Sequence, residues 1–289
     1  MTAALEAAAG MSHADAAEHI VDTLIRERAP RLSGSPTWPV LRPALYAMLG
    51  YRQARLLAEA IADLSGTQAL DFISDWLALK VTARGLERVP AQGRLIVIVN
   101  HPTGLADGVA VDDALRPVRP DLCYFANADA LRVGPRLGEV FIPVEWVEAK
   151  RTRERTRLTV KLAQAALEAE RAIVIFPAGR IARRRKGVLA DPAWAASAVS
   201  LARRYRAPIL PIHLQGPPST LFRLFDHVSP ELRDITLFHE LFNKRGGAFA
   251  LTIGPLVPAH LIGDPAPDVV RLKAYVEQVL PSHPDQPFA

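Results

Sequence analysis

The 289-residue sequence has a single cysteine, Cys123. One thiol excludes an intrachain disulfide, and it excludes a zinc cluster held by several cysteines. Because Cys123 lies in the apolar segment Leu122–Phe125, we expect it to be an ordinary buried core residue.

Long apolar runs are also missing from the sequence. The best candidate, Leu45–Leu64, is interrupted by Arg52, Arg55, Glu59 and Asp63. A helix that spans a bilayer needs about 20 consecutive apolar residues, so no spanning helix is expected. The N-terminus has no basic segment of the kind that begins a signal peptide, which favours a cytoplasmic location.

The net charge of +5 is modest, but the basic residues are clustered. Two clusters, Lys150–Arg157 and Arg180–Lys186, fit solvent-exposed segments when each arginine is considered alone. As a set they favour an anionic partner such as lipid headgroups, an acidic carrier protein or phosphates. Nucleic acid is not expected, because no aromatic residues suited to base stacking alternate with these charges.

A candidate general base follows the apolar run Leu95–Val99, which is typical of a buried strand. The loop after this run contains His101 and, six residues later, Asp107. Imidazole titrates near neutrality, and a nearby carboxylate can fix its tautomer and stabilise the imidazolium as a proton is taken up. We expect Gly104 and Gly108 to let the backbone of this loop turn tightly.

Two further apolar runs end in turns rich in proline or glycine. The first, Ile173–Phe176, continues as Pro177-Ala178-Gly179-Arg180, and the second, Pro208–His213, contains a second proline at position 211. With Asn100-His101 and the following aspartate, these segments resemble the conserved blocks of the glycerolipid (lysophospholipid) acyltransferase superfamily. The resemblance extends from about residue 85 to residue 256, with the blocks in family order and spacing.

The resemblance implies the chemistry of the site. His101 and Asp107 would be catalytic, with His101 as the general base. Substrate would contact six residues: Asn100, Gly104, Phe176, Pro177, Gly179 and Arg180. Backbone amides around Ala178-Gly179 would stabilise the oxyanion of the tetrahedral intermediate, and Arg180 would bind a phosphate or carboxylate of the acceptor. No metal and no cofactor are expected.

Three departures from the family pattern narrow the resemblance. Five residues separate His101 from Asp107, where the commonest family pattern has four. Ala178 stands where the family usually has Glu, and Val144 stands where its second block usually ends in Arg. This combination is similar to a branch labelled hemolysin-like, which is itself similar to acyltransferases that make amino-acid lipids such as ornithine lipids.

We therefore expect an O-acyltransferase of membrane lipid synthesis, acting as a peripheral protein on the inner face of the cell membrane. It would move a fatty acyl group from acyl carrier protein or coenzyme A to a lysophosphatidate-like or lyso-amino-acid lipid acceptor. Two alternatives remain open on the same site. One is a thioesterase, and the other is a catalytically silent lipid-binding protein at the membrane surface.

The expected fold is an α/β domain over residues 84–289, with a mixed, largely parallel sheet flanked by helices. Residues 1–83 are expected to be helical, including a helix over 13–28 and two helices within 39–83. This 39–83 hairpin either packs against the core or docks on a membrane, where Trp38 and Trp76 would suit the interface. Strands are expected at 94–99, 122–125, 172–176, 208–213 and 249–253. Helices are expected at 107–115, 152–170, 192–205, 231–245 and 266–280, and a second-block segment at 138–147.

Overall fold

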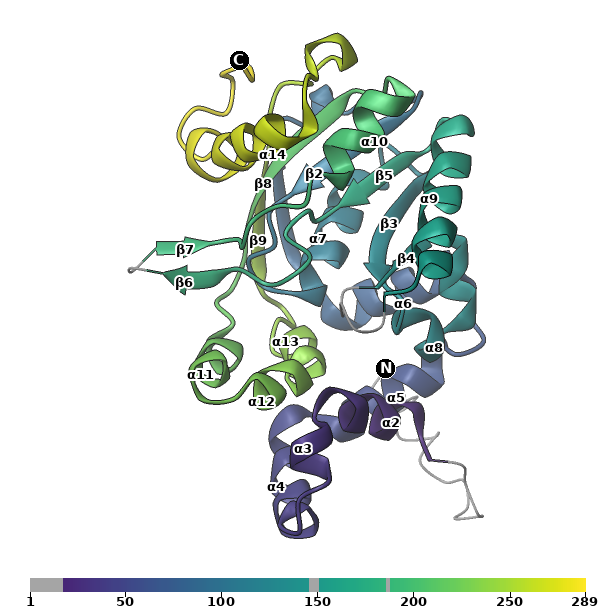
Figure 1. Ribbon diagram of the computed structural model, residues 1–289, viewed down its shortest axis with the longest axis vertical. Helices are drawn as coiled ribbons and strands as arrows, with labels where there is room; N and C mark the ends of the chain where they lie inside the picture. Colours follow the sequence, from purple (N-terminus) through teal and green to yellow (C-terminus); the bar gives the residue numbers. More distant parts are fainter. Residues whose placement is uncertain (1–17, 146–150, 186–187) are drawn as a thin grey trace.

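The computed structural model describes residues 18–145, 151–185 and 188–289, and its centre is a seven-stranded sheet (Figure 1). The strand order is β1-β9-β8-β2-β5-β3-β4. Strands β8, β2, β5, β3 and β4 run parallel, β9 pairs antiparallel with β8, and β1 pairs parallel with β9. The strands are β1 (Lys80–Arg84), β2 (Leu95–Val99), β3 (Leu122–Asn127), β4 (Phe141–Val144), β5 (Ala172–Ile175), β8 (Ile209–Gln215) and β9 (Ala248–Ile253). The predicted mixed, largely parallel sheet is confirmed.

The central strand β2 shows why the sheet is covered on both faces. Every residue of this strand is buried. Leu95, Val97 and Val99 face one apolar cluster, whereas Ile96 and Ile98 face another. Side chains alternate across a strand, so a continuous apolar run is what a strand buried on both faces requires.

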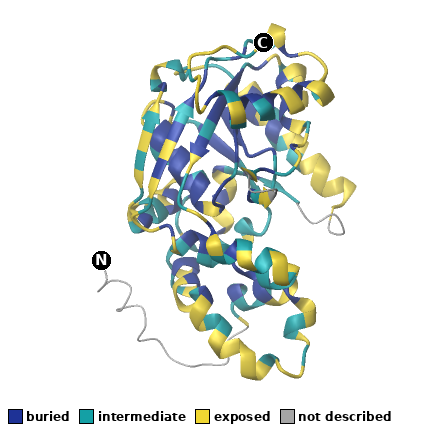
Figure 2. Ribbon diagram, turned by 90° about the vertical axis from the view of Figure 1, so that its left-hand side faces the viewer, coloured by how far each residue is buried: buried dark blue, intermediate teal, exposed yellow. Residues whose placement is uncertain are grey.

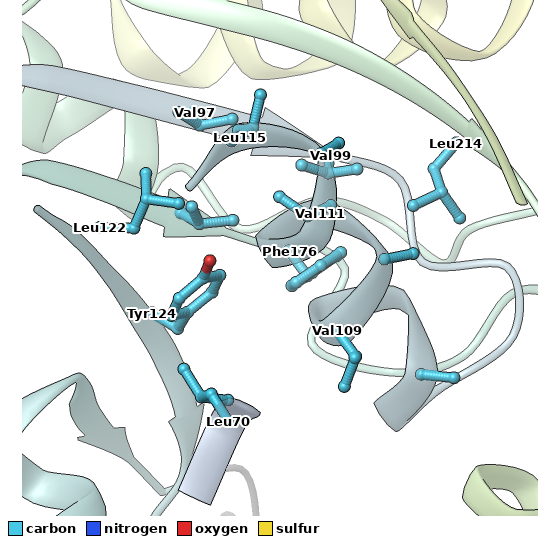
Figure 3. Packing of buried hydrophobic residues seen from close by; sticks show 14 of the residues in the cluster. Leu70, Val97, Val99, Val109, Val111, Leu115, Leu122, Tyr124, Phe176 and Leu214 are labelled. Carbon is cyan, nitrogen blue, oxygen red and sulfur yellow. The ribbon is translucent and has the colours of Figure 1, made fainter. Parts of the chain in front are cut away.

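Helices cover each face of the sheet and complete these two clusters. Helices α6 (Gly66–Leu77), α7 (Leu105–Leu115) and α13 (Leu237–Phe242) contribute to the first cluster, part of which is drawn in Figure 3. Helices α9 (Arg153–Glu168), α10 (Ser197–Tyr205) and α14 (Pro265–Ala274), which continues as a π-helical turn over Tyr275–Val279, contribute to the second.

The N-terminal helices form a third apolar cluster with the segment that follows β8. They are α2 (Ile20–Arg28), α3 (Pro30–Ser33), α4 (Trp38–Leu49) and α5 (Tyr51–Ile61). The predicted helix over 13–28 is observed from Ile20, and its first residues lie outside the described part of the chain. Nothing in the described part of the chain has the length and apolar character of a membrane-crossing helix.

The prediction of two helices over residues 39–83 is wrong in two respects. The first expected helix is divided at Gly50, whose φ of +70° ends α4 before α5 begins. The segment from Lys80 is strand β1, so the sheet begins before residue 84. Exposure alternates along β1, which lies at the edge of the sheet. This strand has only five residues and follows a helix closely, so its pattern was not distinguished from that of the helix.

The segments on either side of β8 also differ from expectation. Residues 183–185 and 188–190 pair as two antiparallel strands, β6 (Arg183–Arg185) and β7 (Val188–Ala190), instead of a solvated loop. Helix α10 begins only at Ser197. The expected helix over 231–245 is two helices, α12 (Pro230–Ile235) and α13, which meet at the buried Thr236, and α11 (Thr220–Val228) was not expected.

Candidate active site

The candidate site lies where parallel strands of the sheet end. His101 follows the carboxyl end of β2, and Phe176 follows the carboxyl end of the neighbouring strand β5. Ligands of open α/β sheets bind outside the carboxyl ends of the strands, so both motifs lie at the edge of the sheet where a site is expected.

His101 and Asp107 form a direct hydrogen bond, with 2.8 Å between Nδ1 of His101 and Oδ2 of Asp107. Asp107 is fully buried in the first turn of α7, and it also accepts hydrogen bonds from the Thr103 hydroxyl and from the backbone N–H groups of Thr103 and Gly104. Because the carboxylate accepts, Nδ1 of the ring donates and Nε2 keeps its lone pair. The His101 side chain is 17% exposed, so this second nitrogen is the one available to a substrate.

Gly104 makes the loop between His101 and Asp107 possible. Its φ is +111° and its ψ is −142°, a region that is essentially limited to glycine. A Cβ atom at this position would lie 2.9 Å from Cδ1 of Ile181. Gly108 has no such role, because it lies inside α7, and the expectation that it turns the loop is wrong.

A second carboxylate, that of Asp191, holds the backbone of His101. Both of its oxygens lie 3.1 Å from the His101 backbone nitrogen, and Oδ2 also accepts from Nε1 of Trp194 at 2.8 Å. The backbone N–H of Asp191 in turn donates to Glu277 at 2.8 Å. Burial raises the pKa of the Asp191 carboxyl to about 6.

The Phe-Pro turn packs directly against the imidazole. The ring centroids of Phe176 and His101 lie 4.6 Å apart, and the carbonyl of Pro177 accepts from Ala195 N–H at 2.9 Å. Gly179 has a φ of +60°, and its N–H donates to the Phe176 carbonyl at 3.0 Å. The Gly179 N–H therefore already has an acceptor within the turn. In the described part of the chain, the neighbouring N–H of Ala178 has no hydrogen-bond acceptor.

Comparisons with known proteins point to acyltransferases. Residues 80–215, which extend from β1 to the end of β8, match the family model described as Acyltransferase. The chain is 25% identical over 246 residues to a lyso-glycine lipid O-acyltransferase of Bacteroides thetaiotaomicron, covering 82% of this chain and 88% of the relative. It is 28% identical over 200 residues to a protein of the same name from Phocaeicola vulgatus, covering 67% of this chain and 70% of the relative.

An acyltransferase domain is therefore present in residues 80–215, and the relatives support the glycerolipid acyltransferase superfamily. The resemblance seen in the sequence and the expected enzyme class, an O-acyltransferase, are thereby confirmed. The crystal structure of PlsC, a 1-acyl-sn-glycerophosphate acyltransferase from Thermotoga maritima, aligns over 90% of this chain and 93% of its own, with 14% identity and a TM-score of 0.47.

Two other residues of this acyltransferase that were predicted to contact substrate, Asn100 and Arg180, differ in burial. The Asn100 side chain is buried, and it binds both backbone groups of Leu214 at 2.9 and 2.7 Å. It therefore joins the ends of β2 and β8, and these bonds do not favour a substrate contact. Arg180 is exposed on the turn after β5, and none of the described residues forms an ion pair with it.

Burial explains the shifted pKa values of two other residues considered from the sequence, Cys123 and His213. Cys123 is buried as expected, and burial raises the pKa of its thiol to about 11. His213 is mostly buried beneath the C-terminal helix, and burial lowers the pKa of its imidazole. Within the ranges that the structure describes, no group of three or more His, Cys, Asp or Glu residues has the arrangement of a metal site.

Two residues that hold the site in place, Thr103 and Asp191, were not predicted from the sequence. Thr103 lies inside the first motif and has no pattern that separates it from its neighbours. Asp191 lies 90 residues from His101, in a segment expected to precede or begin a helix. Only the three-dimensional structure brings this carboxylate to the histidine.

Proposed function

We propose that this acyltransferase moves a fatty acyl group from a thioester, acyl carrier protein or coenzyme A, to the hydroxyl of an anionic lyso-lipid, with His101 as general base. The observation that carries the proposal is the bond of 2.8 Å between Nδ1 of His101 and Asp107, which leaves Nε2 of this partly exposed ring without a bond to the carboxylate. A hydroxyl is a poor nucleophile towards a thioester until its proton is removed, and this nitrogen is placed to accept it.

The transfer needs no covalent intermediate on the enzyme. Nε2 of His101 takes the proton of the acceptor hydroxyl while its oxygen forms a bond to the thioester carbonyl carbon. The tetrahedral intermediate then collapses as the C–S bond breaks, and the imidazolium returns the proton to the leaving thiolate. Asp107, held by three other donors, stabilises the imidazolium between these steps.

The oxyanion of the intermediate needs hydrogen-bond donors near the ring. The N–H of Ala178 is the candidate that the structure supports, because it lies in the turn beside Phe176 and no described residue accepts from it. The Phe176 ring excludes water from one side of the imidazole.

The acceptor is proposed from the relatives and from the charge of the surface. Both relatives bear the name lyso-glycine lipid O-acyltransferase, so an amino-acid-containing lyso-lipid is the first candidate and lysophosphatidate the second. Such substrates reside in membranes. Exposed apolar residues on α4, including Val40 and Leu41, support a peripheral location at the inner membrane surface.

The test is acyl transfer by the purified protein from labelled acyl carrier protein or acyl-coenzyme A. Acceptors are lyso-glycine lipid, lysophosphatidate and other lysophospholipids. We expect product with at least one acceptor, and a loss of 10²-fold or more in kcat/KM in His101→Ala and in Asp107→Ala. His260→Ala, which removes an exposed histidine, is the matched control and should retain activity.

Other outcomes would contradict the proposal in defined ways. Free fatty acid without acylated product, lost in His101→Ala, would show a thioesterase. An absence of both products together with retained lipid binding would show a catalytically silent binding protein. Equal activity in His101→Ala and wild type would remove the general base from the mechanism.

A further inference from the structure

Two arginines outside the family's sequence blocks lie on elements that are bonded to the His101 loop. Arg184 is on β6, and the residue that precedes this strand, Ala182, donates its N–H to the His101 carbonyl at 2.8 Å. Arg223 is on α11, and the residue that precedes this helix, Ser219, donates its hydroxyl to the Thr103 carbonyl at 2.9 Å. The backbone segments that carry both arginines are therefore bonded to the loop of the candidate base.

The distance along each element is short. Arg184 is two residues from Ala182, which is about 7 Å along an extended strand. Arg223 is four residues from Ser219, one turn of helix and about 6 Å. These distances along the backbone are of the order of the size of a small headgroup, and the charge of Arg184 acts on the Arg223 guanidinium.

The described acidic residues near these arginines are engaged elsewhere. Asp226 interacts with Arg233 at 2.8 Å and with Arg183 at 3.6 Å. Glu240, a buried carboxylate on α13, binds Lys244 at 2.9 Å. The Nε atom of Arg223 is buried without a hydrogen-bond partner among the described residues, and Arg184 is exposed. Burial and the nearby charge of Arg184 lower the pKa of the Arg223 guanidinium, which an anion between them would reverse.

An apolar surface adjoins the two charges. An open depression of about 590 Å³ is lined by Thr220, Leu221, Arg223, Leu224 and His227. On the same helix Leu224 is 58% and Val228 67% exposed, although α11 is otherwise partly buried. A cationic pair beside exposed apolar residues suits an amphipathic ligand with one anionic end.

We propose that Arg184 and Arg223 bind the anionic headgroup, a carboxylate or a phosphate, of the single-chain lipid acceptor, and that the apolar face of α11 contacts its chain. This inference rests on the proposed function, because it assumes that the acceptor is a lyso-lipid. It assigns the anion to β6 and α11, whereas the family pattern pointed to Arg180 on the preceding turn. Planar guanidinium groups suit both headgroups, because each presents two oxygens to a fork of N–H donors.

The test compares acceptors and variants in the full-length protein. The variants are Arg184→Gln, Arg223→Gln, Arg223→Lys and Arg180→Gln, with Arg203→Gln on the exposed side of α10 as the matched control. KM and kcat are measured with lyso-glycine lipid (carboxylate), lysophosphatidate (phosphate) and monoacylglycerol (no charge). Dissociation constants for the same lipids are measured on His101→Ala, alone and combined with each substitution. Thermal unfolding shows whether each variant remains folded.

We expect Arg184→Gln and Arg223→Gln each to raise KM for the charged acceptor by roughly ten- to a hundredfold with little change in kcat. Arg223→Lys should recover part of the loss, and Arg203→Gln should have little effect. Monoacylglycerol should be affected less than threefold by every variant. The acceptor with the larger change identifies carboxylate or phosphate as the preferred headgroup.

Two results would overturn the inference while leaving the proposed function intact. The first is transfer with unchanged KM in both Arg184→Gln and Arg223→Gln, and the second is a rise in KM in Arg180→Gln alone. Conversely, if wild type acylates no lyso-lipid but the His101→Ala protein binds anionic lyso-lipids through Arg184 and Arg223, the proposed function fails and the anion site stands.

Discussion

At the scale of single residues, the two carboxylates near His101 differ in what they contact. Asp107 contacts the imidazole, whereas Asp191 contacts the backbone N–H of the same residue. Asp191 directly follows β7. Its carboxylate accepts from the Trp194 indole, and its backbone N–H donates to Glu277 in the C-terminal π-helical turn. It therefore links the end of β2 to the far end of the chain, and its substitution should change stability as well as activity.

The pKa of Asp191 predicts a specific dependence of stability on pH. Its carboxyl has a pKa of about 6 in the folded protein, against an ordinary value of 3.8 for aspartate. The unfolded chain loses this proton near pH 4, and the folded protein keeps it until about pH 6. The contribution of Asp191 to stability therefore falls as the pH rises through this window, by about 3 kcal/mol in total.

Urea unfolding of wild type and Asp191→Asn at pH 4 and pH 7 measures this contribution. Relative to the variant, which has no titrating group at this position, wild type should lose about 2.5 kcal/mol between the two pH values, because the unfolded carboxyl is already partly ionised at pH 4. Asp75→Asn, which neutralises an exposed carboxylate on α6, is the control. An equal difference between wild type and Asp191→Asn at both pH values would show that this carboxyl titrates normally.

His101 and Asp107 could be predicted because the loop that contains both is short and follows a recognisable strand. Asp191 could not be predicted, because its contact with the His101 backbone depends on the folded position of the β6–β7 hairpin that precedes it. The same reason explains the anion site, since Arg184 and Arg223 are 39 positions apart and meet only through the folded positions of β6 and α11.

At the scale of elements, the segment from β2 into α7 contains two glycines, of which only Gly104 has a backbone conformation that requires glycine. Gly104 has a φ of +111°, and a Cβ atom there would lie 2.9 Å from Cδ1 of Ile181. Gly108 lies inside α7, and nothing lies within 4 Å of the position that its Cβ would occupy. The two residues therefore provide a matched pair for testing the loop geometry.

Gly104→Ala should destabilise the protein by about 1–3 kcal/mol, because alanine must adopt a strained backbone conformation next to Ile181. Gly108→Ala should stabilise it by about 0.5–1 kcal/mol, because alanine favours a helix interior over glycine. Denaturant unfolding measures both changes, and kcat should fall in Gly104→Ala alone. The same sign of change in both variants would contradict this assignment of the turn.

The elements that sequence patterns predicted well are those with buried faces. Strands β2, β3, β5, β8 and β9 have apolar runs or alternation that only a sheet accommodates. Strand β6 consists of three arginines, so no apolar pattern marks the β6–β7 hairpin. The edge strand β1 and helix α11 were missed for a related reason, since each leaves much of its surface exposed.

At the scale of the whole molecule, the N-terminal helices and the candidate site are connected through the segment after β8. Helix α3 donates the backbone N–H groups of Arg31 and Leu32 to Glu231 on α12, at 3.0 and 2.8 Å. Helices α2 to α5 lie at the end of the molecule away from α14, and exposed residues predominate along the outermost of them (Figures 1 and 2). Trp76 is not at that surface, because it packs against Phe242 with ring centroids 5.1 Å apart.

The exposed apolar residues of α4 predict where a membrane would contact the protein. Val40 is 80% exposed on this helix, and Leu41 and Arg42 beside it are also exposed. Insertion of Val40 or Leu41 below the headgroups would stabilise binding through apolar burial, and Arg42 would be attracted to anionic lipids. Val40→Glu and Leu41→Glu should each lower the partition coefficient for phosphatidylethanolamine–phosphatidylglycerol vesicles by roughly tenfold.

Cosedimentation with these vesicles measures the partition coefficient. Val270→Glu is the matched control, since Val270 is 66% exposed and belongs to α14, which lies at the opposite end of the molecule (Figure 1). Transfer to a short-chain acceptor that is monomeric in solution should be unchanged in Val40→Glu, because α4 contributes no residue to the candidate site. With acceptor presented in vesicles, the same variant should lose activity in proportion to its lost binding. Weaker binding in Val270→Glu than in Val40→Glu would place the membrane at the other end of the protein.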